Sequence, residues 1–222
     1  MNTSTTPFQP VAISEALTEL ISVSQFLHQQ GWTPATSSNF STRNNEPKGS
    51  FFISRSGKDK GTLTQHDFMA VDAKGLPLAG VEGTPSAETL LHAWVYENFP
   101  EVNTVLHTHS LNGTLLSKLC EEFGEFTVSN LEILKGFAGI TSHEASVTIP
   151  IIANHQDMTV IAEGLSRYQA NVTNPLRGFL LAGHGLYTWG NTTAEARRHV
   201  EVMEFLMAYA LQWYQSTGAW PE

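Results

Sequence analysis

The chain has 222 residues and a formal net charge of −9, with 12 Lys and Arg against 21 Asp and Glu. This acidic balance disfavours non-specific binding to nucleic acid or to an anionic membrane surface. Hydrophobic residues make up 41% of the chain, which is typical of a globular protein rather than a disordered one.

Several features disfavour a secreted or membrane protein. No apolar run approaches the ~20 residues that span a bilayer. Residues 1–10 are polar and lack the apolar core of a signal peptide. Cys120 is the only cysteine, so no internal disulfide can form, in keeping with a reducing compartment. We therefore expect a cytoplasmic protein with neither a membrane nor a nucleic-acid partner.

Helical periodicity begins near the N-terminus. Ser14 can cap a helix, and Gly31 ends it. Its inner face is expected to carry Ile13, Leu17, Leu20, Ile21, Ser24 and Leu27. Residues 32–61 are rich in Ser, Thr, Asn and Gly, with one short predicted strand at residues 51–53. Thr84 and Pro85 predict the start of a second helix. The apolar stripe of that helix is expected at Ala87, Leu91, Trp94 and Val95.

Strands and helices alternate in the second half of the chain. Strands are predicted at residues 102–109, 147–152 and 178–182, and residues 186–189 continue in extended form after a turn. Asp157 caps a predicted short helix. Thr192 and Glu195 form a capping box for the last helix, whose inner face carries Ala196, Val200, Met203, Met207, Ala210 and Tyr214. This interleaving predicts an α/β domain, with a central sheet covered by helices on both faces.

Basic residues are concentrated in one short stretch. Five of the 12 Lys and Arg are Arg43, Lys48, Arg55, Lys58 and Lys60. Such a stretch is either a solvated loop or a binding site for a small anion, and composition alone does not separate the two.

The strongest local signal is a pair of histidines at the end of a predicted strand. Side chains two apart on a strand share a face, so His107 and His109 can reach one metal ion. His184 lies between two glycines after another strand. Three imidazoles with an open fourth position are typical of catalytic zinc. The alternative is that these are ordinary polar residues at strand ends.

Two carboxylates are candidates for proton transfer. Glu88 follows Pro-Ser-Ala at a predicted helix start, where backbone N–H groups favour anions. Glu132 has the apolar neighbours Leu131 and Ile133. Apolar surroundings raise the pKa of a carboxyl group, which suits a general base near neutral pH. Taken alone, either one could be a surface or helix-end residue.

Five short motifs, in this order, resemble the class II aldolase family. They are Ser-Ser-Asn-Phe-Ser at residues 37–41, Ile-Ser-Arg-Ser-Gly at 53–57, Pro-Ser-Ala-Glu at 85–88, Val-Leu-His-Thr-His at 105–109 and Gly-His-Gly-Leu at 183–186. The ordered set is far more specific than any single motif. The resemblance implies a three-layer α/β/α fold with a central mixed, largely antiparallel sheet. It also implies one catalytic domain over residues 1–222, with a flexible segment over about residues 1–12.

The resemblance further implies a site for a sugar phosphate. One Zn²⁺ per subunit would be held by His107, His109 and His184. The phosphate would lie where the family motifs place it, at Asn39, Ser56, Gly57 and Ser86, with added charge from Lys58 or Lys60. The expected assembly is a homotetramer with sites near subunit interfaces.

Two segments indicate a dehydratase within this family. They are Leu-Glu-Ile-Leu-Lys-Gly at residues 131–136 and His-Gly-Leu-Tyr-Thr-Trp-Gly at 184–190. Aldolases and epimerases of the family usually lack a glutamate at the position that matches Glu132. They also often carry a second histidine where this chain has Gly183. The expected substrate is a 2-ketose 1-phosphate with a methylthio group at C5. Glu132 would be the principal acid/base, with Glu88 in a supporting role near the metal and the phosphate.

Other functions remain open from the sequence. The chain could be an aldolase or epimerase of another sugar phosphate, because the family shares its zinc chemistry. It could be a non-enzymatic structural domain like the adducin head, which the three histidines and two glutamates disfavour. A hydrolytic zinc enzyme is a weaker alternative that no further motif supports.

Overall fold

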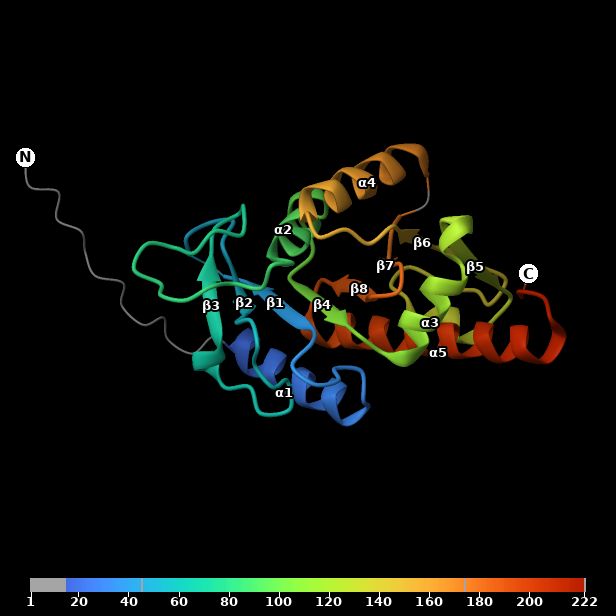
Figure 1. Ribbon diagram of the computed structural model, residues 1–222, viewed down its shortest axis with the longest axis horizontal. Coiled ribbons are helices and arrows are strands. Elements are labelled where there is room, and N and C mark those ends of the chain that lie inside the picture. The colour runs from blue at the N-terminus through green and yellow to red at the C-terminus, as the bar shows by residue number, and fades with distance from the viewer. Residues whose placement is uncertain (1–14, 45, 174, 222) are drawn as a thin grey trace, which may run out of the picture.

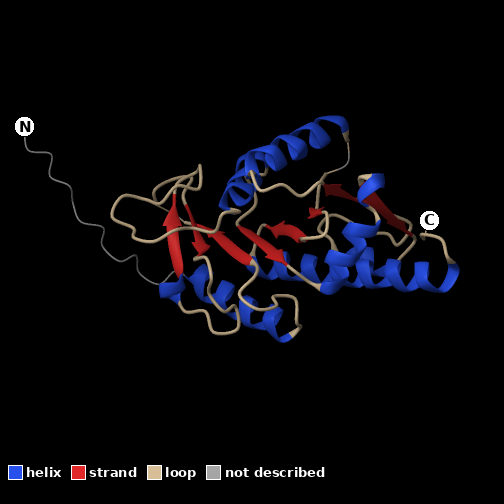
Figure 2. Ribbon diagram, viewed as in Figure 1, coloured by secondary structure: helices blue, strands red, loops and turns tan. Residues whose placement is uncertain are grey.

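The computed structural model describes residues 15–44, 46–173 and 175–221 (Figure 1). Over these residues the chain forms one eight-stranded sheet, in the order β3-β2-β1-β4-β8-β7-β6-β5. Helices cover both faces of it (Figure 2). The expected three-layer fold with a mixed, largely antiparallel sheet is therefore confirmed. The expected cap at Ser14, the face position Ile13 and the segment 1–12 lie outside the described residues.

The N-terminal part builds one end of the sheet. Helix α1 (Glu15–Gln29) is followed by β1 (Asn39–Arg43), β2 (Phe51–Ser54), the 3-10 turn η1 (Gln65–Asp67) and β3 (Phe68–Val71). The strand expected at residues 51–53 is confirmed as β2. The sequence analysis missed β1 and β3. Strand β1 is hard to recognise because it is mostly polar, yet Asn39, Ser41 and Thr42 are buried between its two neighbouring strands.

The second helix begins later than expected. Helix α2 spans Thr89–Asn98, and Glu88 occupies its N-cap position. Pro85 instead forms an isolated β-bridge with Arg55. It therefore lies in an extended segment before the helix rather than in the first helical turn. Ala87 is consequently exposed. Leu91, Trp94 and Val95 are buried as expected.

The middle of the chain contains two further elements that the sequence analysis missed. Strand β4 (Thr104–Thr108) is followed by α3 (Leu111–Leu119), η2 (Glu121–Phe123), β5 (Glu125–Ser129) and η3 (Glu132–Gly136). The missed elements are α3 and β5. Ser110 caps α3 by accepting a hydrogen bond from the Gly113 N–H at 2.9 Å. Leu116 is buried, but Leu111, Leu115 and Leu119 are exposed, so α3 lacks the usual inward-facing apolar stripe.

The remaining elements follow the expected order. They are β6 (Ser146–Ile152), α4 (Met158–Asn171), β7 (Gly178–Leu181), β8 (Gly185–Gly190) and α5 (Thr193–Thr217). Asp157 caps α4, which is longer than expected. Thr192 caps α5, but the Glu195 carboxylate accepts from the Asn191 N–H rather than from the cap residue. Tyr214, expected on the inner face, is exposed and stacks on Trp220.

Strand directions place three strand ends together. Strands β6 and β7 pair in parallel, and the other neighbouring pairs in the sheet are antiparallel. As a result the end of β4, the end of β7 and the start of β8 lie at one edge of the sheet. Helices α2 and α4 cover the face shown above the sheet in Figure 1, and α1, α3 and α5 cover the other.

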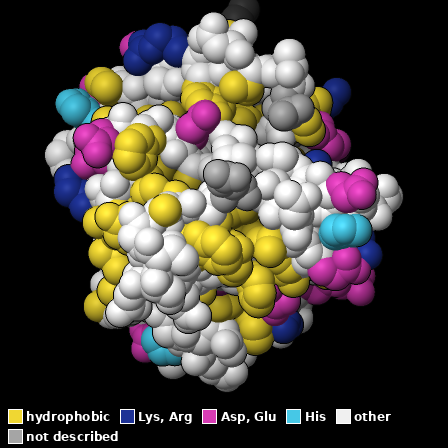
Figure 3. Space-filling view, turned by 90° about the vertical axis from the view of Figure 1, so that its right-hand side faces the viewer, with side chains coloured by type: hydrophobic (Ala, Val, Ile, Leu, Met, Phe, Trp, Pro, Cys, Tyr) yellow, Lys and Arg dark blue, Asp and Glu magenta, His cyan; other side chains and the backbone are white. Residues whose placement is uncertain are grey.

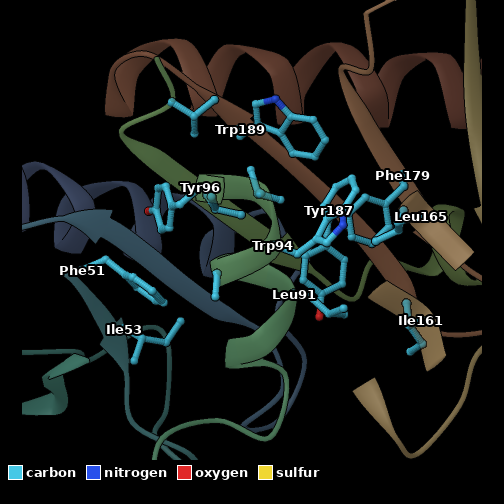
Figure 4. Packing of buried hydrophobic residues seen from close by; sticks show 14 of the residues in the cluster. Phe51, Ile53, Leu91, Trp94, Tyr96, Ile161, Leu165, Phe179, Tyr187 and Trp189 are labelled. Carbon is cyan, nitrogen blue, oxygen red and sulfur yellow. The ribbon is translucent and has the colours of Figure 1, made fainter. Parts of the chain in front are cut away.

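Aromatic side chains form much of the core between the sheet and the α2–α4 layer (Figure 4). Phe179 and Tyr187 stack with ring centroids 4.7 Å apart, and Trp94 meets Phe179 edge-on at 6.4 Å. Burying such a side chain contributes ~1.5–3 kcal/mol. The core therefore holds β7, β8 and α2 rigidly next to the strand ends described above. Within the described part of the chain, no helix is both long and apolar enough to cross a membrane.

Candidate metal centre and adjoining cleft

Three histidines converge at the edge of the sheet where β4 and β7 end. The ring centroids of His107 and His109 are 4.5 Å apart, and that of His184 lies 5.1 Å and 4.6 Å from them. Together with Glu88, each offers a ligand atom, and these four atoms lie within 4.8 Å of one another. The predicted convergence of these histidines is therefore found in the fold.

Glycines on both sides allow His184 to reach the cluster. Gly183 adopts a positive φ of 64°, which favours glycine. At Gly185 an added Cβ would stand 2.1 Å from the Thr108 carbonyl oxygen. Helix α3 fixes the same turn, because Ser117 Oγ accepts from the Gly183 N–H and Thr114 Oγ1 donates to the His184 carbonyl.

The donor set fits a divalent metal ion. The His107 Nδ1–H donates to the Leu186 carbonyl at 2.9 Å, which leaves the Nε2 lone pair facing the cluster. His109 Nε2 lies 2.7 Å from His107 Nε2. Burial lowers the pKa of His107 well below its usual value and that of His109 to about 4. Neutral imidazoles whose nitrogens converge in this way are the ligands zinc prefers.

Glu88 lies against the histidines at the start of α2. Its carboxylate oxygens are 3.0 Å from His184 Nε2 and 3.5 Å from His107 Nε2. Burial opposes ionisation of this carboxyl group. The neighbouring histidines and a hydrogen bond from Asn39 outweigh that effect and hold the pKa of Glu88 below its usual range.

A buried hydrogen-bond chain orients Asn39. Strand pairing puts Asn39 directly beside His107, and its amide nitrogen donates to Ser86 Oγ at 3.2 Å and to the Glu88 carboxylate. Its amide oxygen contacts His92 Nε2. Behind His92, Ser41 Oγ lies 2.7 Å from Nδ1 and 2.8 Å from the Tyr96 hydroxyl.

This chain fixes the tautomer of His92. Burial lowers the pKa of His92 to about 3, so the ring is neutral. Its Nε2–H donates to Asn39 while its Nδ1 accepts from Ser41. Sequence analysis gave no role to His92, Ser41 or Tyr96. A usable signal was the spacing, because His92 lies one helical turn after Glu88 and Tyr96 one turn further on.

A cleft opens beside the histidines. Its lining residues lie in, or directly beside, four of the five segments that the family motifs mark. They are Thr36, Ser37, Ser38, Asn39, Arg55, Ser56, Gly57, Ser86, Ala87, Glu88 and His109. The four predicted phosphate-binding residues Asn39, Ser56, Gly57 and Ser86 are thus brought together on one surface.

The basic stretch does not act as one unit. Arg43 donates to the carbonyls of Val102 and Tyr96, and Arg55 to those of His66 and Glu82. Lys58 pairs with Asp67 at 3.0 Å. Lys60 alone of these five is fully buried, with 1% of its surface exposed.

Glu132 lies far from the histidines of its own chain. It follows β5, whose last residue, Ser129, pairs with Ser146 at the start of β6. The histidine cluster lies near the other end of β6, where Ile152 pairs with Leu181, six residues or roughly 20 Å along the strand. The Glu132 side chain is 71% exposed and pairs with Lys135. The expectation that Leu131 and Ile133 desolvate it is therefore not met within one chain.

Comparison with known proteins agrees with this geometry. The sequence model of the family described as Class II Aldolase and Adducin N-terminal domain matches residues 18–211, and the chain belongs to that family. A solved L-fuculose 1-phosphate aldolase superposes with a TM-score of 0.74 at 21% identity, covering 93% of this chain and 89% of its own. That likeness supports the fold alone.

Closer relatives carry a more specific name. A methylthioribulose-1-phosphate dehydratase of Picosynechococcus sp. is 47% identical over 87% of this chain and 90% of its own length. A methylthioribulose-1-phosphate dehydratase of Stenotrophomonas maltophilia is 45% identical over 96% of this chain and 97% of its own length. The predicted resemblance to these dehydratases is confirmed. A dehydratase is a hydro-lyase, so the expectation of a lyase is confirmed as well.

Proposed function

We propose that this chain is a zinc-dependent methylthioribulose-1-phosphate dehydratase, which acts in methionine salvage in the cytoplasm. The observation that carries the proposal is the convergence of His107, His109 and His184 beside a cleft lined by Asn39, Ser56, Gly57 and Ser86. The identity of about 45% to dehydratases over nearly the whole chain supports the choice of reaction.

The three histidines would hold one zinc ion per subunit. Bound there, the ion supplies Lewis-acid stabilisation of the negative charge that develops on the substrate during proton removal. The chain contributes rigid ligand positions, since the His107 ring is fixed by Leu186 and the His184 turn by α3.

The phosphate group would bind at the far side of the cleft. Ser56 and Gly57 form an exposed turn there, and Ser86 lies beside the N-terminus of α2. Backbone N–H groups at a helix start favour anions. Asn39 would connect this subsite to the metal centre, because its amide contacts both Ser86 and Glu88.

Dehydration requires two proton movements. A base removes the proton from C3 of the 2-ketose, and an acid protonates the C4 hydroxyl as it leaves as water. The resulting enol then takes up a proton at C4 and releases its C3 hydroxyl proton, which gives 2,3-diketo-5-methylthiopentyl 1-phosphate. We propose Glu132 as the principal acid/base, with Glu88 in a supporting role beside the metal and the phosphate.

Glu132 would act in the site of a neighbouring subunit. In one chain it lies at the opposite end of the sheet from the histidines, so it can serve only a site built with another copy. An exposed apolar stripe on α3 and η2 favours such an assembly: Leu111, Leu115 and Leu119 of α3 and Phe123 of η2 are 79%, 45%, 43% and 58% exposed. Figure 3 views the end of the molecule near α3, where hydrophobic side chains gather on the surface. We propose a homotetramer.

Mixing inactive subunits tests this arrangement. Purified His107→Ala and Glu132→Gln proteins should each be inactive, but mixed after reversible dissociation they should regain a substantial part of the wild-type activity. Recovery is expected because some sites then combine intact histidines with an intact Glu132 from the neighbour. A mixture that stays inactive after confirmed subunit exchange would place both residues in one subunit's site or remove Glu132 from the mechanism.

One assay tests the reaction itself. The protein should convert methylthioribulose-1-phosphate with loss of water, lose activity with a chelator and regain it with Zn²⁺. Release of dihydroxyacetone phosphate from a sugar phosphate, or formation of a C4 epimer, would instead indicate an aldolase or epimerase. Full activity after complete metal removal would overturn the zinc assignment.

A further inference from the structure

Lys60 is a buried cation held only by backbone carbonyls. Its Nζ donates to the Thr36 carbonyl at 3.1 Å and to the Lys58 carbonyl at 2.6 Å. An ammonium group has three N–H donors, so one has no partner among the described residues. The Lys60 backbone is fixed as well, because Ser24 Oγ on α1 donates to its carbonyl at 2.7 Å.

Both carbonyls belong to segments of the cleft. Thr36 lines the cleft, and Lys58 directly follows the Ser56-Gly57 turn that also lines it. Lys60 is absent from the lining itself, but its ammonium is bonded to the carbonyl of the lining residue Thr36. Its charge reaches the site, because the Glu88 carboxylate raises the pKa of Lys60 and Lys60 lowers the pKa of His109.

The neighbouring carboxylates do not neutralise Lys60 by direct contact. Asp59 faces His28 at 3.9 Å, Glu88 contacts His184 and Asn39, and Asp67 pairs with Lys58. Burial lowers the pKa of Lys60 to about 8, although Asp59 and Glu88 oppose the shift. A buried charge without an oppositely charged partner is costly. An anion bound nearby would offset the cost of burying the Lys60 ammonium.

We propose that Lys60 is the fixed positive charge of the phosphate subsite, and that it selects dianionic phosphate monoesters over uncharged sugars. This role rests on the proposed function. Held by two carbonyls, the ammonium keeps its position before substrate arrives and loses little side-chain entropy on binding. Lys58 lies two residues before Lys60 in the chain, but its side chain pairs with Asp67 and is therefore directed away from the subsite.

Binding of inorganic phosphate tests the role without any turnover. Titration calorimetry on the full-length wild type, both zinc-loaded and chelated, should show binding in the cleft. Lys60→Met should weaken that binding roughly 10- to 100-fold, because one close charge is lost at low dielectric. Lys58→Met is the matched control and should change the affinity less than about twofold, as expected for an exposed pair.

A second measurement needs no variant. At pH 8.5 the phosphate is already a dianion, and a good part of Lys60 is unprotonated. Binding should therefore take up a substantial fraction of a proton, detected as a dependence of the heat on the ionisation enthalpy of the buffer. The other charged or titratable groups facing Lys60 are Asp59, Glu88 and His109. The pKa of Glu88 is held below its usual range and that of His109 is lowered to about 4.

The outcomes separate the two proposals. Wild-type protein that binds no phosphate would overturn the subsite, and the proposed function with it. Phosphate binding with no proton uptake, or with equal affinity in a folded Lys60→Met protein, would overturn the role of Lys60 and leave the subsite standing. Proton uptake that disappears in Lys60→Met, with weakened binding, is the result expected.

Discussion

The ring of His107 lies flat on the ring of Tyr187, with centroids 3.9 Å apart and planes inclined by 14°. The two residues face each other across β4 and β8, and Tyr187 is completely buried. The stack therefore sets the plane in which His107 offers its Nε2.

Shortening Tyr187 should disturb the metal centre through this stack. Tyr187→Ala should cost about 3–5 kcal/mol of stability, as for other large aromatic truncations, and weaken zinc binding roughly tenfold or more, because ligand orientation is lost. Tyr187→Phe keeps the ring and is the control. Chemical denaturation and competitive zinc titration measure both effects. Zinc affinity unchanged in a folded Tyr187→Ala protein would contradict this account.

Removing one histidine should release the metal. His184→Ala deletes a ligand on the Gly183–Gly185 turn without touching the core, so zinc content and activity should fall together while the fold persists. His143→Ala, which changes an exposed histidine, should keep both. Elemental analysis and circular dichroism give the readouts. Full zinc occupancy in His184→Ala would show that the assignment is wrong.

A negative charge at Ser86 should repel the phosphate. Ser86→Asp places a carboxylate in the cleft beside Asn39 and Glu88, and KM should rise roughly tenfold or more by like-charge repulsion. Ser86→Ala should have a smaller effect, and Ser142→Asp on the exposed surface none. Steady-state kinetics on the phosphorylated substrate decide the matter, since an unchanged KM for Ser86→Asp would place the phosphate elsewhere.

His92 should act through Asn39 rather than on its own. His92→Leu leaves the Asn39 amide oxygen buried without its donor, which costs about 1–3 kcal/mol and frees the amide to rotate away from Glu88. We expect kcat to fall roughly tenfold, with partial rescue in His92→Gln, whose amide nitrogen can replace Nε2. In an Asn39→Ala background, His92→Leu should have little further effect on kcat. Additive effects of the two substitutions would indicate a merely structural role.

Stability should fall as pH rises through the titration of Glu204. This carboxyl group is 4% exposed on α5, and neither oxygen has a well-formed hydrogen bond among the described residues. Burial raises the pKa of Glu204 to about 7, although nearby Ser110 and Asn112 lower it slightly. Because the folded state binds the proton more tightly than the unfolded state, stability is fully present below about pH 4.5 and declines up to pH 7.

Glu204→Gln isolates this effect. The variant should match the wild type near pH 4.5 and exceed its free energy of unfolding above pH 7, by as much as about 3 kcal/mol. Urea denaturation of both proteins across this range gives the difference curve. A difference that does not change with pH would mean that Glu204 is already ionised in the folded protein or equally neutral in both states.

The convergence of the three histidines could be predicted from the sequence because its signals are local. His107 and His109 share a strand face by the period of two, and the glycines around His184 mark a turn that only small residues permit. The same local reasoning failed for α3, where three of the four leucines are exposed, and for β1, whose polar side chains are buried and hydrogen-bonded to α2. In both cases the deciding contacts come from residues distant in the chain.

The position of Glu132 could not be predicted for a different reason. Its apolar neighbours suggested a desolvated carboxylate, but its place depends on the order and direction of β5, β6 and β7. Those are properties of the whole sheet, which a six-residue segment does not encode. For the same reason the contact between Asn39 and His92, which joins β1 to α2, became visible only in the folded chain.

The strand order also governs when the metal centre can form. Glu88, His107, His109 and His184 come from segments far apart in the chain, and the last of them lies between β7 and β8. A nascent chain on the ribosome therefore exposes two histidines long before the third can join them. Under the proposed function, zinc can meet all three histidines only after synthesis has passed β8, so binding of the ion would follow completion of the sheet rather than start it.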